Sequence, residues 1–135
     1  MGLLIDTDVL ILADRRRTGL DFSPWRQYGA AYISAVTASE LLVGVHRAQT
    51  EAQRARRTAF VESILGALPA LPFDLETARV HAQLLAALPR NETVGAHDIL
   101  IAATALRHGY PVLTHNGRDF RKLAGVEVLE YRIEE

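Results

Sequence analysis

The chain has 135 residues, of which 49% are hydrophobic, and this is enough for one compact domain over residues 1–135. It has no cysteine, which excludes disulfides, thiolate catalysis and a cysteine-ligated zinc site and is typical of the reducing cytoplasm. The formal net charge of -1 excludes a globally basic nucleic-acid binder, although arginines gather at residues 15–17 and 54–57, and no apolar run is long enough to cross a membrane.

The chain opens on a short aliphatic run, residues 3–5, that leads directly into Asp6. Such a run predicts a strand buried on both faces, as in a parallel sheet, with Asp6 at its C-terminal end. Residues 9–17 are apolar and then basic, which predicts a helix that carries arginines in its last turn and stops at Gly19. Because ligands of open parallel sheets bind at the carboxyl ends of strands, Asp6 is the first candidate for a functional residue.

The next part of the chain predicts a short helix, a strand and two long helices. Ser23 and Pro24 resemble an N-cap followed by a proline in the first helical turn. Residues 31–33 predict the second strand. Apolar residues recur at helical spacing over residues 37–48 and again over residues 51–68, so we expect an antiparallel helical hairpin.

The following segment predicts an edge strand and two further helices. Residues 71–73 include a proline, which restricts them to an edge strand. Asp74 is the expected N-cap of a helix that runs to residue 88. Residues 90–95 form a polar loop that leads to residues 96–98, and residues 99–106, apolar nearly all round, predict a buried central helix closed by Gly109. The predicted core-facing stripe of the first of these helices consists of Ala78, His81, Ala82, Leu85 and Leu88.

The end of the chain predicts two more strands, residues 111–113 and 126–129, separated by a polar turn at 114–118 and a short helix at 119–123. Glu134 and Glu135 would form a charged, frayed tail. Strands that alternate with helices predict an α/β fold with three layers, α/β/α, around a central parallel sheet of four to five strands, from which the helical hairpin protrudes.

Four acids stand at the end of a predicted strand or shortly after it: Asp6, Glu40, Asp98 and Asp119. Each has an ordinary explanation as a cap or turn residue, and Glu40 fits a capping box with Thr37. Together, however, they would meet at one edge of the sheet, where four carboxylates repel one another unless a cation neutralises them. Magnesium or manganese is the expected cation because these hard ions prefer oxygen ligands.

A carboxylate site with one or two such ions activates water and stabilises charge on a phosphoryl group, which predicts a phosphodiester substrate. Thr114 and Asn116 add neutral hydrogen-bonding groups beside it. The five histidines have no compact zinc-ligand spacing. The chain also has no phosphate-cradling glycine loop, no Gly-x-Ser-x-Gly elbow and no dinucleotide fingerprint.

Four sequence blocks carry a resemblance to a known family. They are Leu-Ile-Asp-Thr-Asp-Val-Leu-Ile at residues 4–11, Ser-Ala-Val-Thr-Ala-Ser-Glu-Leu-Leu-Val-Gly at 34–44, His-Asp-Ile-Leu-Ile-Ala at 97–102 and Val-Leu-Thr-His-Asn-Gly-Arg-Asp-Phe at 112–120. In this order and spacing they resemble the PIN-domain ribonucleases, and among these the VapC-like toxins of prokaryotic toxin–antitoxin pairs. The resemblance covers essentially the whole chain.

The resemblance implies a PIN-like fold and an endoribonuclease that hydrolyses RNA with Mg²⁺ or Mn²⁺. It also implies a homodimer, a cognate antitoxin that occludes the site, and an apolar groove for an antitoxin helix along the hairpin at residues 37–68. By position in the motifs, the implied catalytic and metal-binding acids are Asp6, Glu40, Asp98 and Asp119. The implied supporting residues are Thr7, Asp8, Thr114 and Asn116.

The sequence leaves alternatives for the role of Asp8 and for the identity of the fourth metal ligand. Asp8 stands where the family usually has asparagine or serine, so it either adds charge to the metal site or faces its own helix. The fourth ligand comes from the position of Asn116 in some members of the family and from that of Asp119 in others.

Two other functions compete with the ribonuclease. Asp6 and Asp8 imitate the Asp-x-Asp pair of haloacid-dehalogenase-like phosphatases, which also need a later lysine, and the only lysine here is Lys122 in the predicted last helix. The second alternative is a non-catalytic binding module in which all four acids are helix caps or hold an inert cation.

Overall fold

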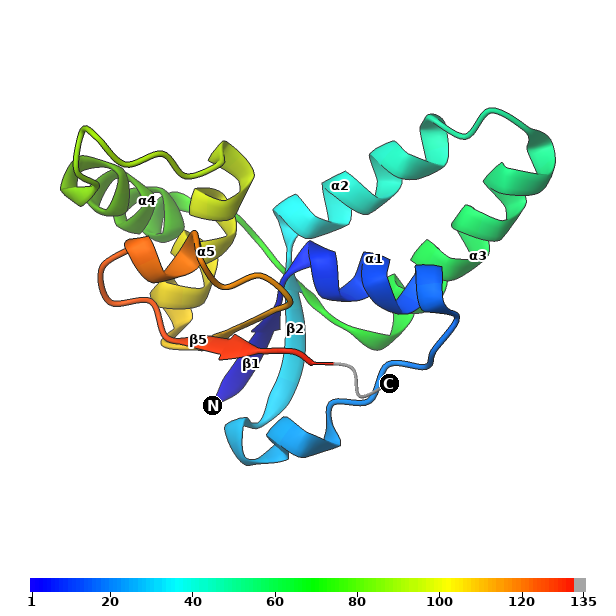
Figure 1. The fold of residues 1–135 in the computed structure, drawn as a ribbon, viewed down its shortest axis with the longest axis horizontal. Coiled ribbons are helices and arrows are strands. Elements are labelled where there is room, and N and C mark those ends of the chain that lie inside the picture. The colour runs from blue at the N-terminus through cyan, green and yellow to red at the C-terminus, as the bar shows by residue number, and fades with distance from the viewer. Residues whose placement is uncertain (133–135) are drawn as a thin grey trace.

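The computed structural model describes residues 1–132 and shows a parallel sheet with helices on both faces (Figure 1). The five strands are β1 (Gly2–Ile5), β2 (Ala30–Ser34), β3 (Ala70–Leu71), β4 (Val112–Thr114) and β5 (Val128–Glu130). Their order is β3-β2-β1-β4-β5, and every neighbouring pair is parallel. The predicted fold class is therefore confirmed, while the predicted tail at residues 134–135 lies outside the described residues.

Among the described residues, five α-helices and two short 3-10 helices connect the strands. The α-helices are α1 (Thr7–Arg16), α2 (Ala35–His46), α3 (Glu51–Ala67), α4 (Leu75–Ala87) and α5 (Ala96–His108). The 3-10 helices are η1 (Ser23–Tyr28) and η2 (Phe120–Lys122). None of the helices in the described part of the chain combines the length and hydrophobicity that a membrane span requires.

The central strand β1 is buried on both faces, as its aliphatic sequence predicts. Leu3 and Ile5 belong to a core cluster formed with α1, α2 and α3, whereas Leu4 belongs to a second cluster formed with α4 and α5. Successive side chains of a strand point to opposite faces, so these two clusters are the two sides of the sheet. Because β2 and β4 flank β1 on either side, the chain changes direction across the sheet at β1, and the carboxyl end of β1 is where such folds bind ligands.

The predicted helical hairpin is formed by α2 and α3, which extend away from the sheet together (Figure 1). Arg57 of α3 donates a hydrogen bond through Nη1 to the backbone oxygen of Gly44 in α2 at 2.8 Å. Arg56 of α3 pairs with Asp14 of α1 at 3.6 Å. The first contact joins the two helices of the hairpin, and the second ties the hairpin to α1.

Several predicted boundaries are wrong for local reasons. Helix α2 begins at Ala35, two residues before the prediction, because the Ser34 hydroxyl caps it by accepting a hydrogen bond from the Thr37 N–H at 3.0 Å. The capping box of Thr37 with Glu40 is therefore wrong. Helix α1 ends before Gly19 because Arg17 already adopts a left-handed conformation, with φ of 53°. Phe22, not Ser23, is the N-cap residue of η1.

The predicted face of α4 is wrong in part, although its N-cap is confirmed: Ala78, His81 and Leu88 are half-buried, but Ala82 and Leu85 are exposed. Asp74 accepts a hydrogen bond from the Thr77 N–H at 2.9 Å, as expected. Leu85, however, is 50% exposed, whereas Thr77 and Leu84 are buried. Helix α4 has more apolar residues than one face can bury, so the helical spacing of these residues does not determine which of them are buried. The packing of α4 against α5 determines it.

Candidate active site

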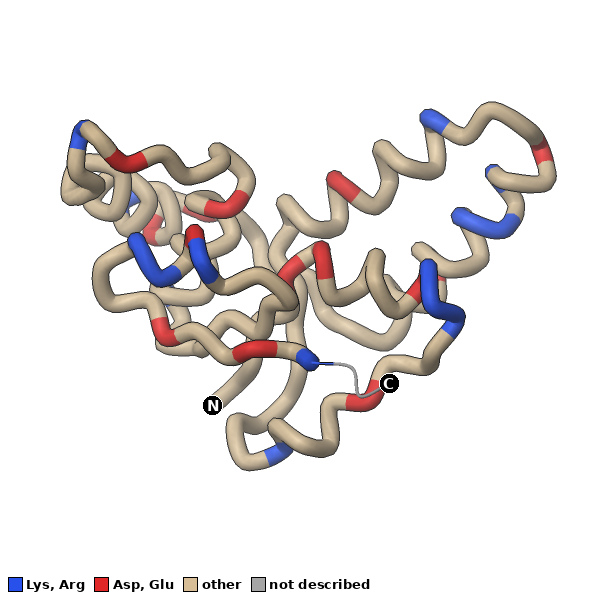
Figure 2. The backbone as a smooth tube through the Cα atoms, in the orientation of Figure 1, with Lys and Arg blue, Asp and Glu red and all other residues tan. Residues whose placement is uncertain are grey.

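All four predicted acids line one cavity of about 260 Å³ at the carboxyl end of the central strands. Its polar lining consists of Asp6, Thr7, Asp8, Glu40, Asp98, Asn116 and Asp119. Asp6 follows β1, Glu40 belongs to α2, and Asp98 belongs to the first turn of α5. Asn116 and Asp119 follow β4. None of the described residues that line the cavity is a lysine or arginine. In Figure 2, basic positions gather on α3, at the end of α1 and around η2.

Asp6 is both the cap of α1 and the most buried acid of the cavity, with 5% of its surface exposed. Its Oδ1 accepts a hydrogen bond from the Thr7 N–H at 2.8 Å, and its Oδ2 lies 2.9 Å from the Thr114 hydroxyl. Burial and the neighbouring Asp8 charge raise the pKa of Asp6 to about 8. The capping role that the sequence suggests therefore accounts for only one of its two oxygens.

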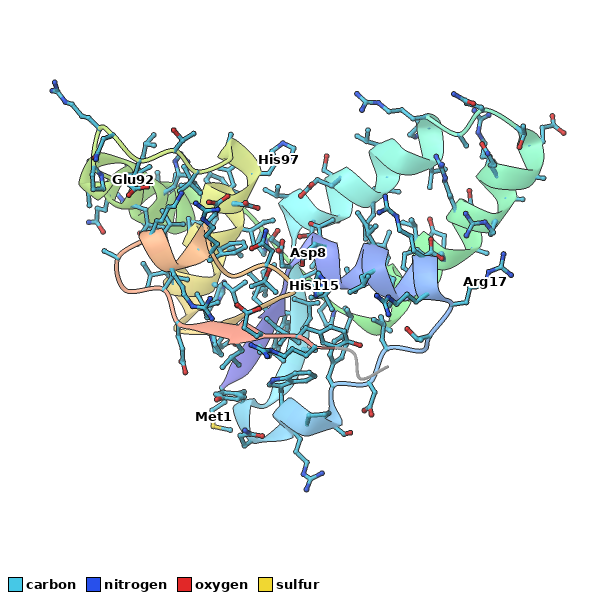
Figure 3. The ribbon with its side chains drawn as sticks, in the orientation of Figure 1. Met1, Asp8, Arg17, Glu92, His97 and His115 are labelled. Carbon is cyan, nitrogen blue, oxygen red and sulfur yellow. The ribbon has the colours of Figure 1, made fainter. Side chains whose placement is uncertain are left out.

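Asp8 faces the site and not the amides of its own helix. It accepts a hydrogen bond from the His115 N–H at 3.2 Å, and its Oδ2 lies 3.2 Å from the Thr114 hydroxyl. Figure 3 shows Asp8 and His115 close together beside the end of β1. Thr114, fully buried at the end of β4, is thus shared by the carboxylates of Asp6 and Asp8.

Glu40 is oriented by a hydroxyl from another helix. Thr7 of α1 donates a hydrogen bond through Oγ1 to Glu40 Oε1 at 3.0 Å. The other oxygen of Glu40 lies 3.5 Å from Nδ1 of His97, an exposed residue at the start of α5 (Figure 3). Glu40 therefore links α1, α2 and α5 across the cavity.

Asp98 does not cap its own helix. The N-cap of α5 is Gly95, and none of the described side chains makes a capping hydrogen bond there. Burial, followed by the charges of Asp119, Asp8 and Glu40, raises the pKa of Asp98 above its ordinary value. Asp119 is half-buried like Asp98, and its Oδ1 lies 3.1 Å from Nζ of Lys122. Both acids are thus held near the other carboxylates without a capping function.

The donor set of this cavity fits a hard divalent cation. Five carboxylates and an amide are the oxygen ligands that Mg²⁺ and Mn²⁺ prefer. Burial first, and the neighbouring carboxylates second, raise the pKa values of Asp6 and Asp98, and a bound cation would offset both effects. Within residues 1–132, however, no three Asp, Glu or His side chains are arranged so that they could already hold an ion together. Coordination therefore requires the carboxylates to rotate toward a common point.

The sequence of residues 3–126 matches the PIN domain. The chain belongs to the PIN-domain family. It is 42% identical to Ribonuclease VapC1 of Rickettsia felis over 130 residues, 96% of each chain. It is also 33% identical over 100 residues to the tRNA(fMet)-specific endonuclease VapC of Salmonella typhimurium, covering 73% of this chain and 74% of that protein.

A solved structure shows the same relationship. VapBC-5 of Mycobacterium tuberculosis, a member of the VapBC family of toxin–antitoxin systems, superposes with a TM-score of 0.76 at 32% identity. The match covers 96% of this chain and 98% of the other. The predicted VapC-type PIN-domain ribonuclease is therefore confirmed, and this family favours it over the phosphatase and the non-catalytic module.

The sequence reasoning missed one residue of this PIN domain. The sequence alone gives Lys122 no role beside the acids, but its Nζ pairs with Asp119 and with Glu92. The spacing of three residues between Asp119 and Lys122 was a usable signal, since residues i and i+3 are neighbours in a helical turn. Glu92 lies 30 residues away and gave no such signal.

Proposed function

We propose that this VapC-family protein is an endoribonuclease that hydrolyses RNA phosphodiester bonds with Mg²⁺ or Mn²⁺. The proposal depends on one observation: the acids that the family motifs single out converge with Asp8 on one cavity whose described lining has no basic side chain. A divalent cation bound there polarises a phosphoryl oxygen and activates water.

The residues that line the cavity would have different roles in this reaction. Asp6 and Asp98 would be the principal ligands because burial and neighbouring carboxylates disfavour the charged form of each unless a cation is bound, with Glu40 and Asp119 completing the set. Thr7 and Thr114 would orient Glu40 and Asp6 through the hydrogen bonds described above. Asn116, an exposed amide at the rim, would bind the substrate or its attacking water, and Asp119 would then be the fourth ligand.

Incubation of the purified protein with total cellular RNA tests this function. With Mg²⁺ or Mn²⁺ we expect discrete fragments that disappear in chelator, and the fragment ends identify the cleavage site. A relative named as tRNA(fMet)-specific makes initiator tRNA the first individual substrate to try. Absence of cleavage with either metal, or cleavage that resists the chelator, contradicts the proposal.

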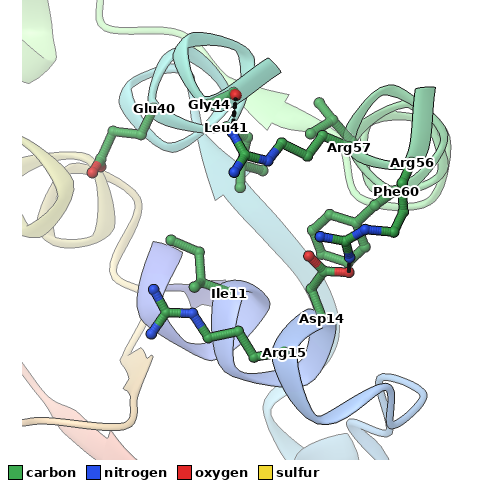
Figure 4. A pocket seen from close by; sticks show the side chains of 10 residues that line it. Ile11, Asp14, Arg15, Glu40, Leu41, Gly44, Arg56, Arg57 and Phe60 are labelled. Carbon is green, nitrogen blue, oxygen red and sulfur yellow. Dashed lines mark hydrogen bonds and ion pairs between the residues drawn. The ribbon is translucent and has the colours of Figure 1, made fainter. Parts of the chain in front are cut away.

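We propose that the cognate antitoxin binds a groove between α1, α2 and α3. This groove has a volume of about 310 Å³, and Figure 4 shows arginines at its rim beside an apolar floor. Its apolar floor consists of Ile11, Leu41, Phe60 and Val61. Ile11 and Glu40 line both this groove and the acidic cavity, so a helix seated in the groove would reach the site and occlude it.

A tryptophan placed in the groove is expected to weaken antitoxin binding by about 100-fold while RNA cleavage persists. Gly44 lines the groove, and a Cβ there meets no atom within 4 Å, so a side chain at this position starts in open space beside the groove. Gly66 of α3 has the same free space outside the groove, which makes Gly66→Trp the matched control. Titration of each variant with the protein encoded by the neighbouring gene measures the effect. Equal affinity of the two variants would place the antitoxin elsewhere.

We further propose that the chain is a single domain over residues 1–135 and that it acts in the cytoplasm. We also propose that it forms a homodimer. Phe73, Leu75 and Leu85 on and before α4 are 38%, 66% and 50% exposed, and they lie outside the acidic cavity and the groove. Such apolar side chains suit a contact with a second copy. Sedimentation equilibrium is expected to give twice the chain mass of 14.9 kDa, and a monomer at micromolar concentration would contradict it.

A further inference from the structure

Lys122, the only lysine of the chain, joins two segments that lie far apart in the sequence. Its side chain is only 25% exposed. Nζ lies 3.1 Å from Asp119 Oδ1, 3.4 Å from Glu92 Oε2 and 3.2 Å from the backbone oxygen of Thr93. The first acceptor belongs to the turn before η2, and the other two belong to the connection between α4 and α5.

The connection between α4 and α5 leads directly into the turn that carries Asp98. Val94 of this connection is buried in the core. Gly95, the N-cap of α5, lies against the Asp98 carboxylate, since a Cβ at Gly95 would be 3.7 Å from Asp98 Oδ2. A displacement of residues 92–95 would therefore displace Asp98, and Lys122 is the residue that binds both this segment and Asp119.

The charges explain why such a link is needed. Asp98 and Asp119 line the same cavity, so their carboxylates repel each other when no cation lies between them. The Lys122 ammonium attracts Asp119 and Glu92 at the same time. It opposes the separation of the two segments without lining the acidic cavity.

We propose that Lys122 is a positioning residue that holds Asp119 and the α4–α5 connection together, so that Asp98 and Asp119 stay close enough to share a divalent cation. This inference rests on the metal-dependent function proposed above. It assigns a role to a side chain that is neither a ligand nor a contact of the substrate.

Removal of Lys122 has two opposite effects on cation binding, and their sign separates positioning from simple charge. Loss of a positive charge beside an acidic site would strengthen cation binding through reduced repulsion. Loss of a positioning contact would weaken it, because side chains that orient metal ligands contribute about 10- to 100-fold to affinity. A role only in packing the turn would leave the affinity unchanged.

The test is calorimetric titration with Mn²⁺ of the wild type and three variants. We expect Lys122→Met to bind Mn²⁺ about tenfold more weakly and Lys122→Arg to recover most of the loss. Arg79→Met is the matched control, because Arg79 forms an ion pair with Glu76 at the same spacing of three residues on α4, outside the cavity. Unchanged or tighter binding by Lys122→Met overturns the proposal.

Hydrogen exchange in chelator provides a readout that needs no metal. We expect the amides of residues 92–95 to exchange faster in Lys122→Met but not in Arg79→Met, and equal rates would also overturn the proposal. If the wild type binds no Mn²⁺, the metal-dependent function fails, and with it the role of Lys122 at the site. If circular dichroism shows that Lys122→Met is unfolded, the same two measurements on Lys122→Gln decide the question.

Discussion

Asp98→Asn is expected to reduce metal-dependent RNA cleavage by about three orders of magnitude, because a bound cation contributes several kcal/mol to the transition state. Asparagine keeps the size of the side chain but removes a charged ligand. The fold should persist and gain stability, since burial and three neighbouring carboxylates disfavour the charged form of Asp98. We expect the thermal midpoint in chelator to rise by about 2 to 5 °C.

Initial rates of fragment formation measure the loss of activity, and growth of cells that express each variant measures toxicity. Asp74→Asn is the matched control: Asp74 caps the neighbouring helix α4 through the Thr77 N–H, asparagine caps equally well, and the residue lies outside the cavity. This control should cleave RNA at the wild-type rate. An Asp98→Asn protein that still cleaves RNA would exclude Asp98 as a ligand and would leave the proposed site without one of its two principal acids.

The metal-free protein is expected to lose stability as the pH rises from about 4 toward 8, and Asp6 is the cause. The carboxyl of Asp6 has an ordinary pKa of 3.8 and a folded-state pKa of about 8, raised mainly by burial and by Asp8. Between these values the folded protein holds a proton that the unfolded chain has released, so rising pH favours unfolding. Below pH 3.8 this contribution to stability is fully present, and above pH 8 it is lost.

Asp6→Asn is expected to remove this pH dependence. At pH 8 in chelator its thermal midpoint should exceed that of the wild type by about 5 °C, whereas Mn²⁺ should stabilise only the wild type. Mn²⁺ binding by the wild type should also strengthen as the pH rises toward 8, because the cation competes with the proton on Asp6. Thermal scans with and without Mn²⁺ from pH 5 to pH 9 check these points.

Asp74→Asn tests whether the removal of any aspartate charge, and not only that of Asp6, raises the thermal midpoint at pH 8. The pKa of Asp74 lies below its ordinary value because its carboxylate accepts the Thr77 N–H and hydroxyl, so Asp74→Asn should gain no stability at pH 8. A wild-type protein that is most stable near pH 8 in chelator would show that Asp6 is charged in the metal-free fold.

The sequence by itself determined the elements and the set of acids. The aliphatic residues 3–5 predict the buried strand β1, Asp74 predicts the start of α4, and the helical periodicity predicts the hairpin of α2 and α3. The position of Asp6, Glu40 and Asp119 after strands of a parallel sheet was enough to predict that they would meet at one edge. Asp98 follows helix α4 and not a strand, so only its motif, not its place after a strand, predicts that it joins them. These features follow from local sequence because caps and periodicity involve residues within one or two turns.

Only the tertiary structure decided what each acid contacts. Asp8 faces Thr114 and His115, more than 100 residues away, and Glu40 accepts a hydrogen bond from Thr7, 33 residues away, in place of the predicted capping box. The link from Lys122 to Glu92 and Thr93 likewise depends on how two connections pack. The local sequence determines on which face of its helix or strand a residue lies. Its hydrogen-bond or ion-pair partner on that face depends on how helices and strands that are far apart in the chain pack together.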